Sequence, residues 1–323
     1  MSDITVDVHL SQDYLTESLR ADVLDGLLAS PKTLPPKWFY DARGSELFEL
    51  ITELPEYYPT RAERRILRDR SAEIANLTHA RGLVELGSGS SEKTRLLLNA
   101  LRETGLTQFV PVDVSPTALR ESAAAIAEDY PDLDVHGVVG DFTEHLDQVP
   151  GEHPRLVAFL GGTIGNLVPS ERSKFLSSLR SVLSEGEWLL LGTDLVKDPD
   201  VLVKAYDDSA GVTAEFNKNV LAVLNREVNA DFDVASFDHV ARWDAEAQWI
   251  EMRLRATRAM DVNLTGLGIK IHFERGEELR TEVSAKFTWP GITAELAEAG
   301  FELIKWYTDP QERFTVSLAR AAG

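Results

Sequence analysis

The chain has no cysteine among its 323 residues, so disulfides, thiolate zinc sites and cysteine nucleophiles are excluded. It is also poor in cations, because 33 lysines and arginines stand against 53 acidic residues, a formal net charge of −20. This charge repels nucleic acids and anionic membranes, which are themselves negative. We therefore expect a small-molecule substrate, no nucleic acid, no membrane and no bound metal.

Long apolar runs are missing too. None approaches the roughly 20 residues of a membrane helix, and the start, MSDITVDVHLSQDYL, lacks the basic and apolar regions of a signal peptide. These absences predict a cytoplasmic protein, and we expect a monomer. A hydrophobic content of 43% is sufficient for a full core in one large or two intertwined domains.

From residue 82, short apolar runs alternate with amphipathic segments. The runs are GLVELG, QFVPVDV, LDVHGVVGDF, RLVAFLGG and EWLLLGTDL. Strands that are apolar throughout are covered on both faces, which predicts an α/β fold with a doubly wound, Rossmann-like parallel sheet. Helices are expected from Ser91, from Ser115 to Tyr130 and from Ser170.

After Leu195 this rhythm ends. Residues 198–225 have a helical pattern, and WIEMRLRATRAM and LRTEVSAKFT alternate with period two, as half-exposed antiparallel strands do. The C-terminal ITAELAEAGFELIKWYTD and FTVSLARA predict a helix and two strands that rejoin the first sheet. The expected domains are therefore a Rossmann-like one and a smaller α+β one. The Rossmann-like domain comprises residues 61–195 and 287–323. The smaller domain comprises the N-terminal lobe 1–60 and the insertion 196–286.

The stretch ELGSGSSEKT follows the first of these strands. Glycines there let the backbone approach a ligand, and the next helix offers free N–H groups. Gly87 and Gly89 match the first two positions of the dinucleotide motif G-x-G-x-x-G, but Glu92 occupies the third. An acid there repels a pyrophosphate, which disfavours a NAD-type oxidoreductase. A βα turn without any ligand remains an alternative.

Two acids accompany the turn. Asp113 ends the second strand, where a carboxylate can accept both ribose hydroxyls, and Asp141 ends the third, where it can accept from an adenine amino group. The backbone N–H of Phe142 can reach the adenine ring. Each acid alone is better explained as a strand-end cap. Together they predict an adenosine bound without phosphates at the carboxyl edge of the sheet.

This pattern resembles class I S-adenosylmethionine-dependent methyltransferases, whose first motif is acid-x-Gly-x-Gly-x-Gly; Glu85, Gly87 and Gly89 fit it, and Ser91 replaces the last glycine. More closely, the chain resembles the histidine-specific Nα-methyltransferases of ergothioneine biosynthesis, over nearly its whole length and in order. The matching segments are LPPKWFYDARGSELFELITELPEYYPTRAE, ELGSGSSEKT, FLGGTIGNL, LLGTDLVKD, residues 205–228 and TEVSAKF.

The resemblance implies S-adenosylmethionine as cofactor and three methyl transfers to the α-amino nitrogen of L-histidine, giving hercynine. The implied cofactor residues are Gly87, Gly89, Lys93, Asp113, Asp141, Phe142 and Gly161. Lys93 would meet the carboxylate of the cofactor's amino acid tail, unless it is a solvated helix charge. Gly161 and Gly162 would leave room around the nitrogen that is methylated.

For the substrate, the resemblance implies Tyr57, Asn166, Tyr206 and the segment 282–284. Asn166 and Tyr206 would hold the carboxylate, whereas Glu282 and Ser284 would meet the two edges of the imidazole. Without the resemblance, the two tyrosines are packing aromatics and Asn166 belongs to a Gly-Asn turn.

Period two gives the predicted strand two faces. Glu282 and Ser284 share one face, and Leu279, Thr281, Val283 and Phe287 fall on or near the other. Without the resemblance, the first face is a plain solvent face.

Two further residues are weaker candidates. Met252 points with Ile250 and Leu254, so it either walls the ring pocket or belongs to the core, and Thr213 would touch the pocket through water. Tyr57 can assist the amine by hydrogen bonding, but a phenol is a poor base at neutral pH, so no general base is assigned. Methylation of another amino acid such as tryptophan, and a non-catalytic adenosine-binding protein, are the remaining alternatives.

Overall fold

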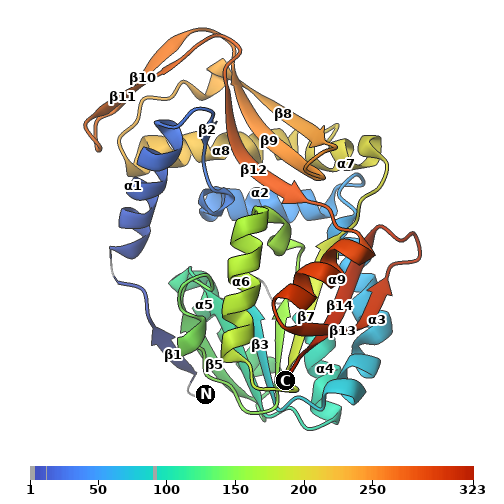
Figure 1. The fold of residues 1–323 in the computed structure, drawn as a ribbon. Coiled ribbons are helices and arrows are strands. Elements are labelled where there is room, and N and C mark those ends of the chain that lie inside the picture. Colours follow the sequence, from blue (N-terminus) through green and yellow to red (C-terminus); the bar gives the residue numbers. More distant parts are fainter. Residues whose placement is uncertain (1–3, 12, 90–92) are drawn as a thin grey trace. The chain divides into compact units, whose positions relative to one another are not determined.

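The computed structural model describes residues 4–11, 13–89 and 93–323, and the chain forms two compact units (Figure 1). Unit 1 consists of Met1–Ser11, Arg61–Leu195 and Phe287–Gly323, and unit 2 of Gln12–Thr60 and Val196–Lys286. The expected lobe of residues 1–60 thus loses its first eleven residues to unit 1. The reason is a short strand, β1 (Thr5–Val8), which pairs in parallel with β5 (Asp134–Val139) of the main sheet.

Unit 1 is built on an eight-stranded sheet in the order β1-β5-β4-β3-β6-β7-β14-β13. The remaining strands are β3 (Gly82–Leu86), β4 (Gln108–Asp113), β6 (Arg155–Phe159), β7 (Trp188–Asp194), β13 (Phe301–Thr308) and β14 (Phe314–Ala321). Neighbouring strands are parallel as far as β7, and β14 returns antiparallel to both of its neighbours. Every residue of β3, β6 and β7 is buried, which is why these strands do not alternate. The predicted α/β class is confirmed.

Helices cover both faces of this sheet (Figure 1). They are α3 (Pro59–Thr78), α4 (Thr94–Glu103), α5 (Pro116–Asp129), α6 (Pro169–Val182) and α9 (Trp289–Glu298), with short 3-10 turns η2 (Leu146–Gln148) and η3 (Thr163–Asn166). Side chains of α3, α4 and α5 share one apolar cluster with the strands. On the other face, α6 is tied to α9 by the ion pair of Arg172 and Glu295 (2.8 Å). Ser115 caps α5 as expected, whereas Ser91 lies outside the described residues.

The strand order creates a switch point in the sheet. From β3 the chain moves to β4 and β5 on one side, then crosses back to β6 on the other side of β3. Ligands of open α/β sheets bind at the carboxyl ends of the strands near such a point. Gly87 directly follows β3, Asp113 ends β4, and Asp141 and Gly161 follow β5 and β6. The predicted cofactor residues therefore gather at one edge.

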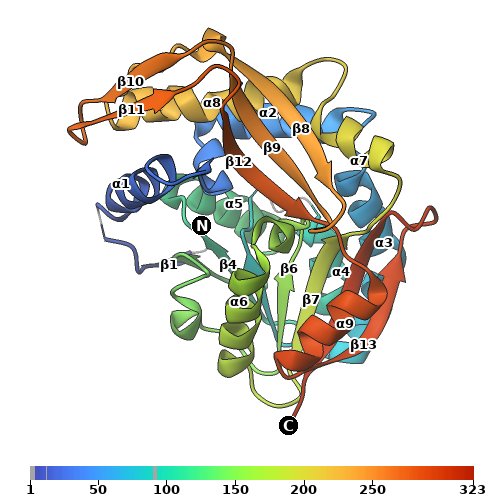
Figure 2. The ribbon, with the colours of Figure 1, turned by 45° about the horizontal axis from the view of Figure 1, so that its top comes forward.

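Unit 2 combines a four-stranded sheet, in the order β2-β12-β9-β8, with a hairpin and helices. The strands are β2 (Lys32–Thr33), β8 (Phe237–Asp244), β9 (Trp249–Ala256), β10 (Met260–Leu264), β11 (Ile269–Phe273) and β12 (Glu278–Ala285). The helices are α1 (Tyr14–Leu27), η1 (Pro36–Phe39), α2 (Ala42–Glu53), α7 (Pro199–Tyr206), α8 (Val212–Glu227) and η4 (Val234–Ser236). Figure 2 shows α8 running beneath β8 and β9, with α2 beside it. This is the expected α+β arrangement, although the helical pattern over 198–225 forms two helices instead of one.

A β-bulge in β12 decides which side chains face the core of unit 2. Arg280 pairs with Arg253, but the next pair along the strands is Glu282 with Met252, so Thr281 is an extra residue. An extra residue shifts the period-two alternation by one position. Residues that oppose each other across a strand pair share a face of the sheet. Glu282 therefore lies on the face of Met252.

The bulge corrects one expectation. Glu282 and Ser284 do share a face, but Leu279, which pairs with Leu254, lies on that same face because the bulge falls between Leu279 and Glu282. Val283 lies on the opposite face, as expected. A regular strand would have placed Glu282 with Arg280, away from the apolar core.

No helix among the residues described is both long and apolar enough to cross a membrane.

Candidate active site

The turn after β3 has the backbone that its glycines predict. Gly87 and Gly89 have φ values of +69° and +48°, in the left-handed region that side chains disfavour. The N–H of Gly87 donates to the carbonyl of Val112 at 2.9 Å. A Cβ added to Gly89 would meet no atom of the residues that the structure describes within 4 Å, so these residues leave space beside it. Glu92 departs from the dinucleotide motif and Ser91 from the methyltransferase motif, and both lie outside the described residues.

Asp113 links the end of β4 to this turn. Its Oδ1 accepts from the N–H of Ser115 at 2.9 Å, and its Oδ2 accepts from the N–H of Gly89 at 3.5 Å. Burial raises the pKa of the carboxyl, against the lowering effect of these bonds. Each carboxylate oxygen can accept two hydrogen bonds, so both retain capacity for a pair of ribose hydroxyls. Asp113 can therefore cap the strand end and bind a ribose at the same time.

Asp141 and Phe142 follow β5. Asp141 Oδ1 accepts from the N–H and the hydroxyl of Thr143, at 2.8 and 2.6 Å, which makes it a local cap. The Phe142 ring stands edge-on to Phe159 and Phe175, with centroids 5.1 and 5.8 Å away. This aromatic group lies beside the glycine turn, because a Cβ on Gly87 would be 4.0 Å from the Phe142 ring. An apolar wall next to capped acids suits an adenine ring.

Glu63 is a site residue that sequence reasoning missed. It is fully buried in α3, and its carboxylate accepts from the ammonium of Lys93 and, at 2.8 Å, from the N–H of Gly161. Lys93 is thus not a solvated helix charge, since only 22% of its side chain is exposed. In the sequence Glu63 stands among arginines, as in an exposed helix face, and no local signal marks it. This carboxylate joins α3, the turn before α4 and the end of β6.

In unit 2, three polar groups form a closed triangle. The hydroxyls of Tyr206 and Ser284 lie 2.7 Å apart. The ammonium of Lys286 donates to both, at 2.9 Å to Tyr206 and 2.8 Å to Ser284, and it lies 4.7 Å from the centre of the Tyr206 ring. Lys286 is 3% exposed. Sequence reasoning missed it, although Lys286 is two positions from Ser284 in TEVSAKF. Tyr206 and Ser284, expected at different ends of the substrate, are therefore in direct contact.

Glu282 stands beside this triangle. Its side chain is half-buried, and burial raises the pKa of the carboxyl to about 7, while the charge of Lys286 pulls it downward. The carboxylate interacts with the charge of a buried lysine and lies on the same face of β12 as the Ser284 hydroxyl, so this face offers an acceptor and a hydroxyl to a polar ring. Met252, directly opposite Glu282, is 1% exposed and belongs to the apolar core of unit 2. Met252 thus has the core role, and its role as a wall of the ring pocket stays a prediction.

A series of aromatic rings in mutual contact begins at Tyr206. Tyr57 stands edge-on to Tyr206 and to Phe48, at 6.4 and 6.1 Å between centroids, and Phe48 contacts Tyr40 at 5.5 Å. The pKa of the Tyr40 phenol is raised by burial first and by Glu282 and Tyr206 second, although 47% of the residue's surface is exposed. Tyr40 is a third residue that sequence reasoning missed, after Glu63 and Lys286. Its signal is the aromatic run WFY within a segment that was already linked to the family.

A buried network fixes the end of α7. Thr281, the bulge residue, donates its hydroxyl to Asn217 Oδ1 at 2.6 Å. The Asn217 amide nitrogen donates to His239 Nδ1 at 2.8 Å, and His239 Nε2 lies 2.8 Å from the carbonyl of Tyr206. Burial lowers the pKa of His239, so the ring is neutral and Nε2 carries the hydrogen. Tyr206 is thereby held through its backbone.

Two predicted residues have fewer contacts. Thr213 is buried at the start of α8, where its N–H donates to Asp208 at 2.7 Å, and its contact with the pocket through water stays a prediction. Asn166 ends η3 in unit 1 and is half-buried. Its expected partner in holding the carboxylate, Tyr206, belongs to unit 2.

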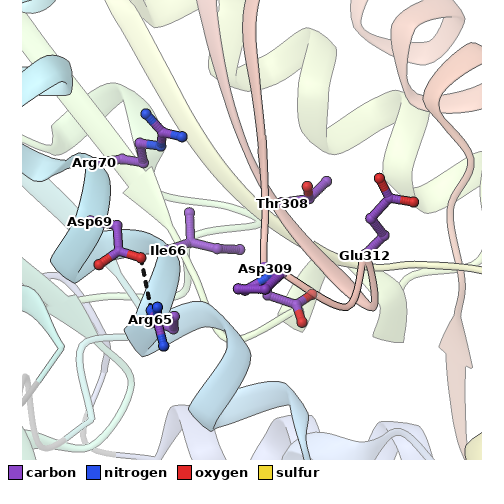
Figure 3. Close-up of a pocket in the computed structure, with 8 residues that line it drawn as sticks. Arg65, Ile66, Asp69, Arg70, Thr308, Asp309 and Glu312 are labelled. Carbon is purple, nitrogen blue, oxygen red and sulfur yellow. Dashed lines mark hydrogen bonds and ion pairs between the residues drawn. The ribbon is translucent and has the colours of Figure 1, made fainter.

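The hollow shown in Figure 3 is a separate feature of unit 1. It measures about 280 Å³ and is lined by α3 and by the turn that joins β13 to β14. Its lining is charged, and Arg65 pairs with Asp69 there at 2.8 Å. No predicted site residue lines it.

Comparison with known proteins decides the family. The model of the histidine-specific, S-adenosylmethionine-dependent methyltransferases matches residues 19–321. The chain belongs to this family. It is 56% identical to the histidine N-alpha-methyltransferase of Mycolicibacterium smegmatis, over 96% of this chain and 97% of the relative. Its identity to the histidine N-alpha-methyltransferase of Mycobacterium tuberculosis is 55%, over 98% and 99% of the two chains.

The enzyme is thus an S-adenosylmethionine-dependent methyltransferase, and the NAD-type alternative falls. An L-tryptophan methyltransferase of Psilocybe serbica is 27% identical over 95% of this chain and 94% of that protein, half the identity of the histidine enzymes. The site of unit 1 fits the cofactor. It offers an open glycine turn, a desolvated carboxylate at Asp113, the Phe142 ring and a lysine whose charge is already paired.

Proposed function

We propose that the enzyme transfers methyl groups from S-adenosylmethionine to the α-amino nitrogen of L-histidine, three times, to give hercynine for ergothioneine biosynthesis. The observation that carries this is the arrangement in β12. Glu282, whose pKa is about 7, and Ser284 lie on one face beside Met252 and Lys286. A carboxylate and a hydroxyl at this spacing match the two nitrogens of an imidazole. A tryptophan indole has only one.

Positioning supplies most of the rate. The cofactor supplies an electrophilic methyl group on a sulfonium, which an amine attacks in line with the departing sulfur. Holding the reactants in that alignment contributes on the order of 7 to 11 kcal/mol. In this proposal Asp113 binds the ribose of the cofactor. The ammonium of Lys93 donates one hydrogen to Glu63 and keeps its other hydrogens for the carboxylate of the cofactor's amino acid tail.

Asn166 is proposed to bind the substrate carboxylate through its amide. Tyr206, the second residue expected there, already shares its hydroxyl with Ser284 and Lys286. Its contribution depends on which hydroxyl of the triangle keeps a hydrogen for the substrate. The amine must lose its proton before it attacks, because an ammonium has no lone pair. We assign this proton to solvent, with Tyr57 as a hydrogen-bonding neighbour.

Incubation with histidine and S-adenosylmethionine, followed by mass spectrometry, tests the activity. Products heavier by one, two and three methyl groups are expected, and no methylated histidine would refute the function. Glu282→Ala tests the site. Its kcat/KM for histidine should fall about a hundredfold, because a bond to a charged group is lost, while S-adenosylhomocysteine affinity changes little. Equal losses in both would remove Glu282 from substrate recognition.

We also propose that the enzyme acts as a monomer in the cytoplasm. The net charge of −20, which opposes self-association, supports the monomer, and a chain without cysteine suits a reducing compartment. Size-exclusion chromatography with light scattering should give the 35.8 kDa of a single chain. A mass of two chains would refute the monomer, and enrichment in a membrane fraction would refute the location.

A further inference from the structure

Glu63 is a fully buried acid that contacts two residues predicted to bind the cofactor. It belongs to α3, and its carboxylate accepts from the ammonium of Lys93 and, at 2.8 Å, from the N–H of Gly161. Burying a carboxylate is costly unless an opposite charge and hydrogen bonds satisfy it. The side chain has no exposed surface, so a cofactor cannot reach Glu63 itself. Any effect of Glu63 on the cofactor must therefore pass through Lys93 or Gly161.

Strand β7 leaves room for this carboxylate at Gly192. A Cβ added to Gly192 would lie 2.2 Å from Glu63 Oε1, closer than two atoms can approach, and 3.4 Å from the backbone nitrogen of Gly161. The φ of Gly192 lies outside the left-handed region, so this glycine is needed for space and not for its backbone. The sheet thus admits the carboxylate at a place where a strand lacks a side chain.

The pair with Glu63 holds the ammonium of Lys93 near the carboxyl end of β6. A Cβ added to Gly161, which follows that strand, would lie 3.9 Å from Lys93 Nζ. A lysine side chain is flexible, and ordering it costs entropy that an ion pair with a fixed partner offsets. An ammonium has three hydrogens, and 22% of the Lys93 side chain is exposed. Lys93 is therefore fixed in place and still able to donate to a ligand.

The pair also changes the charge that a ligand meets. The amino acid tail of S-adenosylmethionine carries a carboxylate and an ammonium, and the sulfonium adds a second positive charge. A lysine without a counter-ion would attract the carboxylate but repel the other two groups. Glu63 offsets this repulsion, while the remaining hydrogens of Lys93 stay available to the carboxylate. A neutral pair thus favours a tail that carries both charges.

We propose that Glu63 is a positioning residue that makes the tail site selective for a zwitterion, because it lets Lys93 donate to a carboxylate without repelling an ammonium. This rests on the role proposed above for Lys93 and extends it to a residue that touches no ligand. Without Glu63 the same lysine would attract simple anions. A tail with a carboxylate alone would then gain affinity relative to a tail with both groups.

Calorimetry with three nucleosides tests this selectivity. They are S-adenosylhomocysteine, its analogue in which hydrogen replaces the tail ammonium, and 5′-methylthioadenosine, which has no amino acid tail. In Glu63→Gln, which keeps the shape of the side chain, the affinity of the carboxylate-only analogue relative to S-adenosylhomocysteine should rise about tenfold. The affinity of 5′-methylthioadenosine should stay within about twofold of the wild type. An unchanged ratio would overturn the proposal, and so would an equal loss for all three nucleosides, which would show a structural role.

Glu187→Gln is the matched control. Glu187 is another buried carboxylate of unit 1, 3% exposed, and it pairs with Arg155 at 2.9 Å. Glu187 directly precedes β7 and Arg155 begins β6, so this pair lies at the opposite end of the two strands from Gly161. The variant should lose stability as Glu63→Gln does but keep the wild-type ratio of affinities. A ratio shifted as far as in Glu63→Gln would overturn the proposal, because the loss of any buried charge would then suffice.

The double variant Glu63→Gln with Lys93→Met tests whether Glu63 acts through Lys93. Removing both partners of a buried pair is tolerated better than removing one, so this variant leaves no unpaired charge to oppose folding. Its ratio of affinities should return to within about threefold of the wild type. A ratio that stays as high as in Glu63→Gln would refute the route through Lys93. No titration contains histidine, so a failure to methylate histidine would refute the proposed function and leave this comparison valid.

Discussion

Glu282→Gln should stabilise the enzyme at alkaline pH and not at acidic pH. The pKa of Glu282 rises from an ordinary 4.5 to about 7, so the folded state holds its proton more tightly than the unfolded state. This stability is fully present below about pH 4.5 and is lost as the pH rises through 7. At 1.36 kcal/mol per pKa unit the complete loss is about 3 kcal/mol. The side chain is half-buried and partly screened by solvent, so we expect about 2 kcal/mol.

Urea titrations of the ligand-free wild type and variant at about pH 5 and pH 8.5 measure this difference. The variant should be more stable only at the higher pH. Glu251→Gln is the control, because Glu251 is buried on β9; burial raises its pKa, but bonds from Arg253 and Arg242 lower it overall. It should be less stable than the wild type at both pH values. If Glu282→Gln showed the same difference at both pH values, the reasoning from burial would fail.

Three further variants test other parts of the site. Asp113→Ala should weaken S-adenosylhomocysteine binding about tenfold or more by calorimetry, since two hydrogen bonds to the ribose are lost; unchanged affinity would exclude it from that role. Glu63→Gln breaks the buried pair with Lys93 and should cost about 3 kcal/mol of unfolding free energy in urea, so a loss under half of that would show the pair to be weak. His239 has a lowered pKa, so its stability contribution is present above about pH 6.5 and is lost on acidification. Melting temperatures of His239→Gln should therefore fall less between pH 7 and about pH 5 than those of the wild type, and identical falls would contradict the neutral ring.

Much of the fold of unit 1 follows from local patterns. Continuous apolar runs such as residues 188–194 become strands covered on both faces, and Ser115 marks the start of a helix. The added strand β1 could not be predicted, because four residues with mixed exposure carry no period strong enough to identify them. The place of β1 in the sheet arises from its pairing with β5, which lies more than a hundred residues away in the sequence.

The site was predictable as residue types but not as contacts. The glycines and Asp113 stand at strand ends, where position along the chain fixes the edge of the sheet. Glu63 and Lys286 were missed because charged residues in helices and half-exposed strands usually face solvent, and only tertiary packing buries these two. The face of Glu282 was also hidden, since one extra residue in a strand leaves no mark in its composition.

That extra residue ties the shape of β12 to the support of a neighbouring helix. Deleting Thr281 would remove the bulge but leave Glu282 opposite Met252, because Arg280 and Glu282 already occupy successive pairs along the two strands. The deletion would instead take away the hydroxyl that donates to Asn217, the first link to His239 and the carbonyl of Tyr206. A single codon lost here would therefore loosen Tyr206 without turning the acidic group.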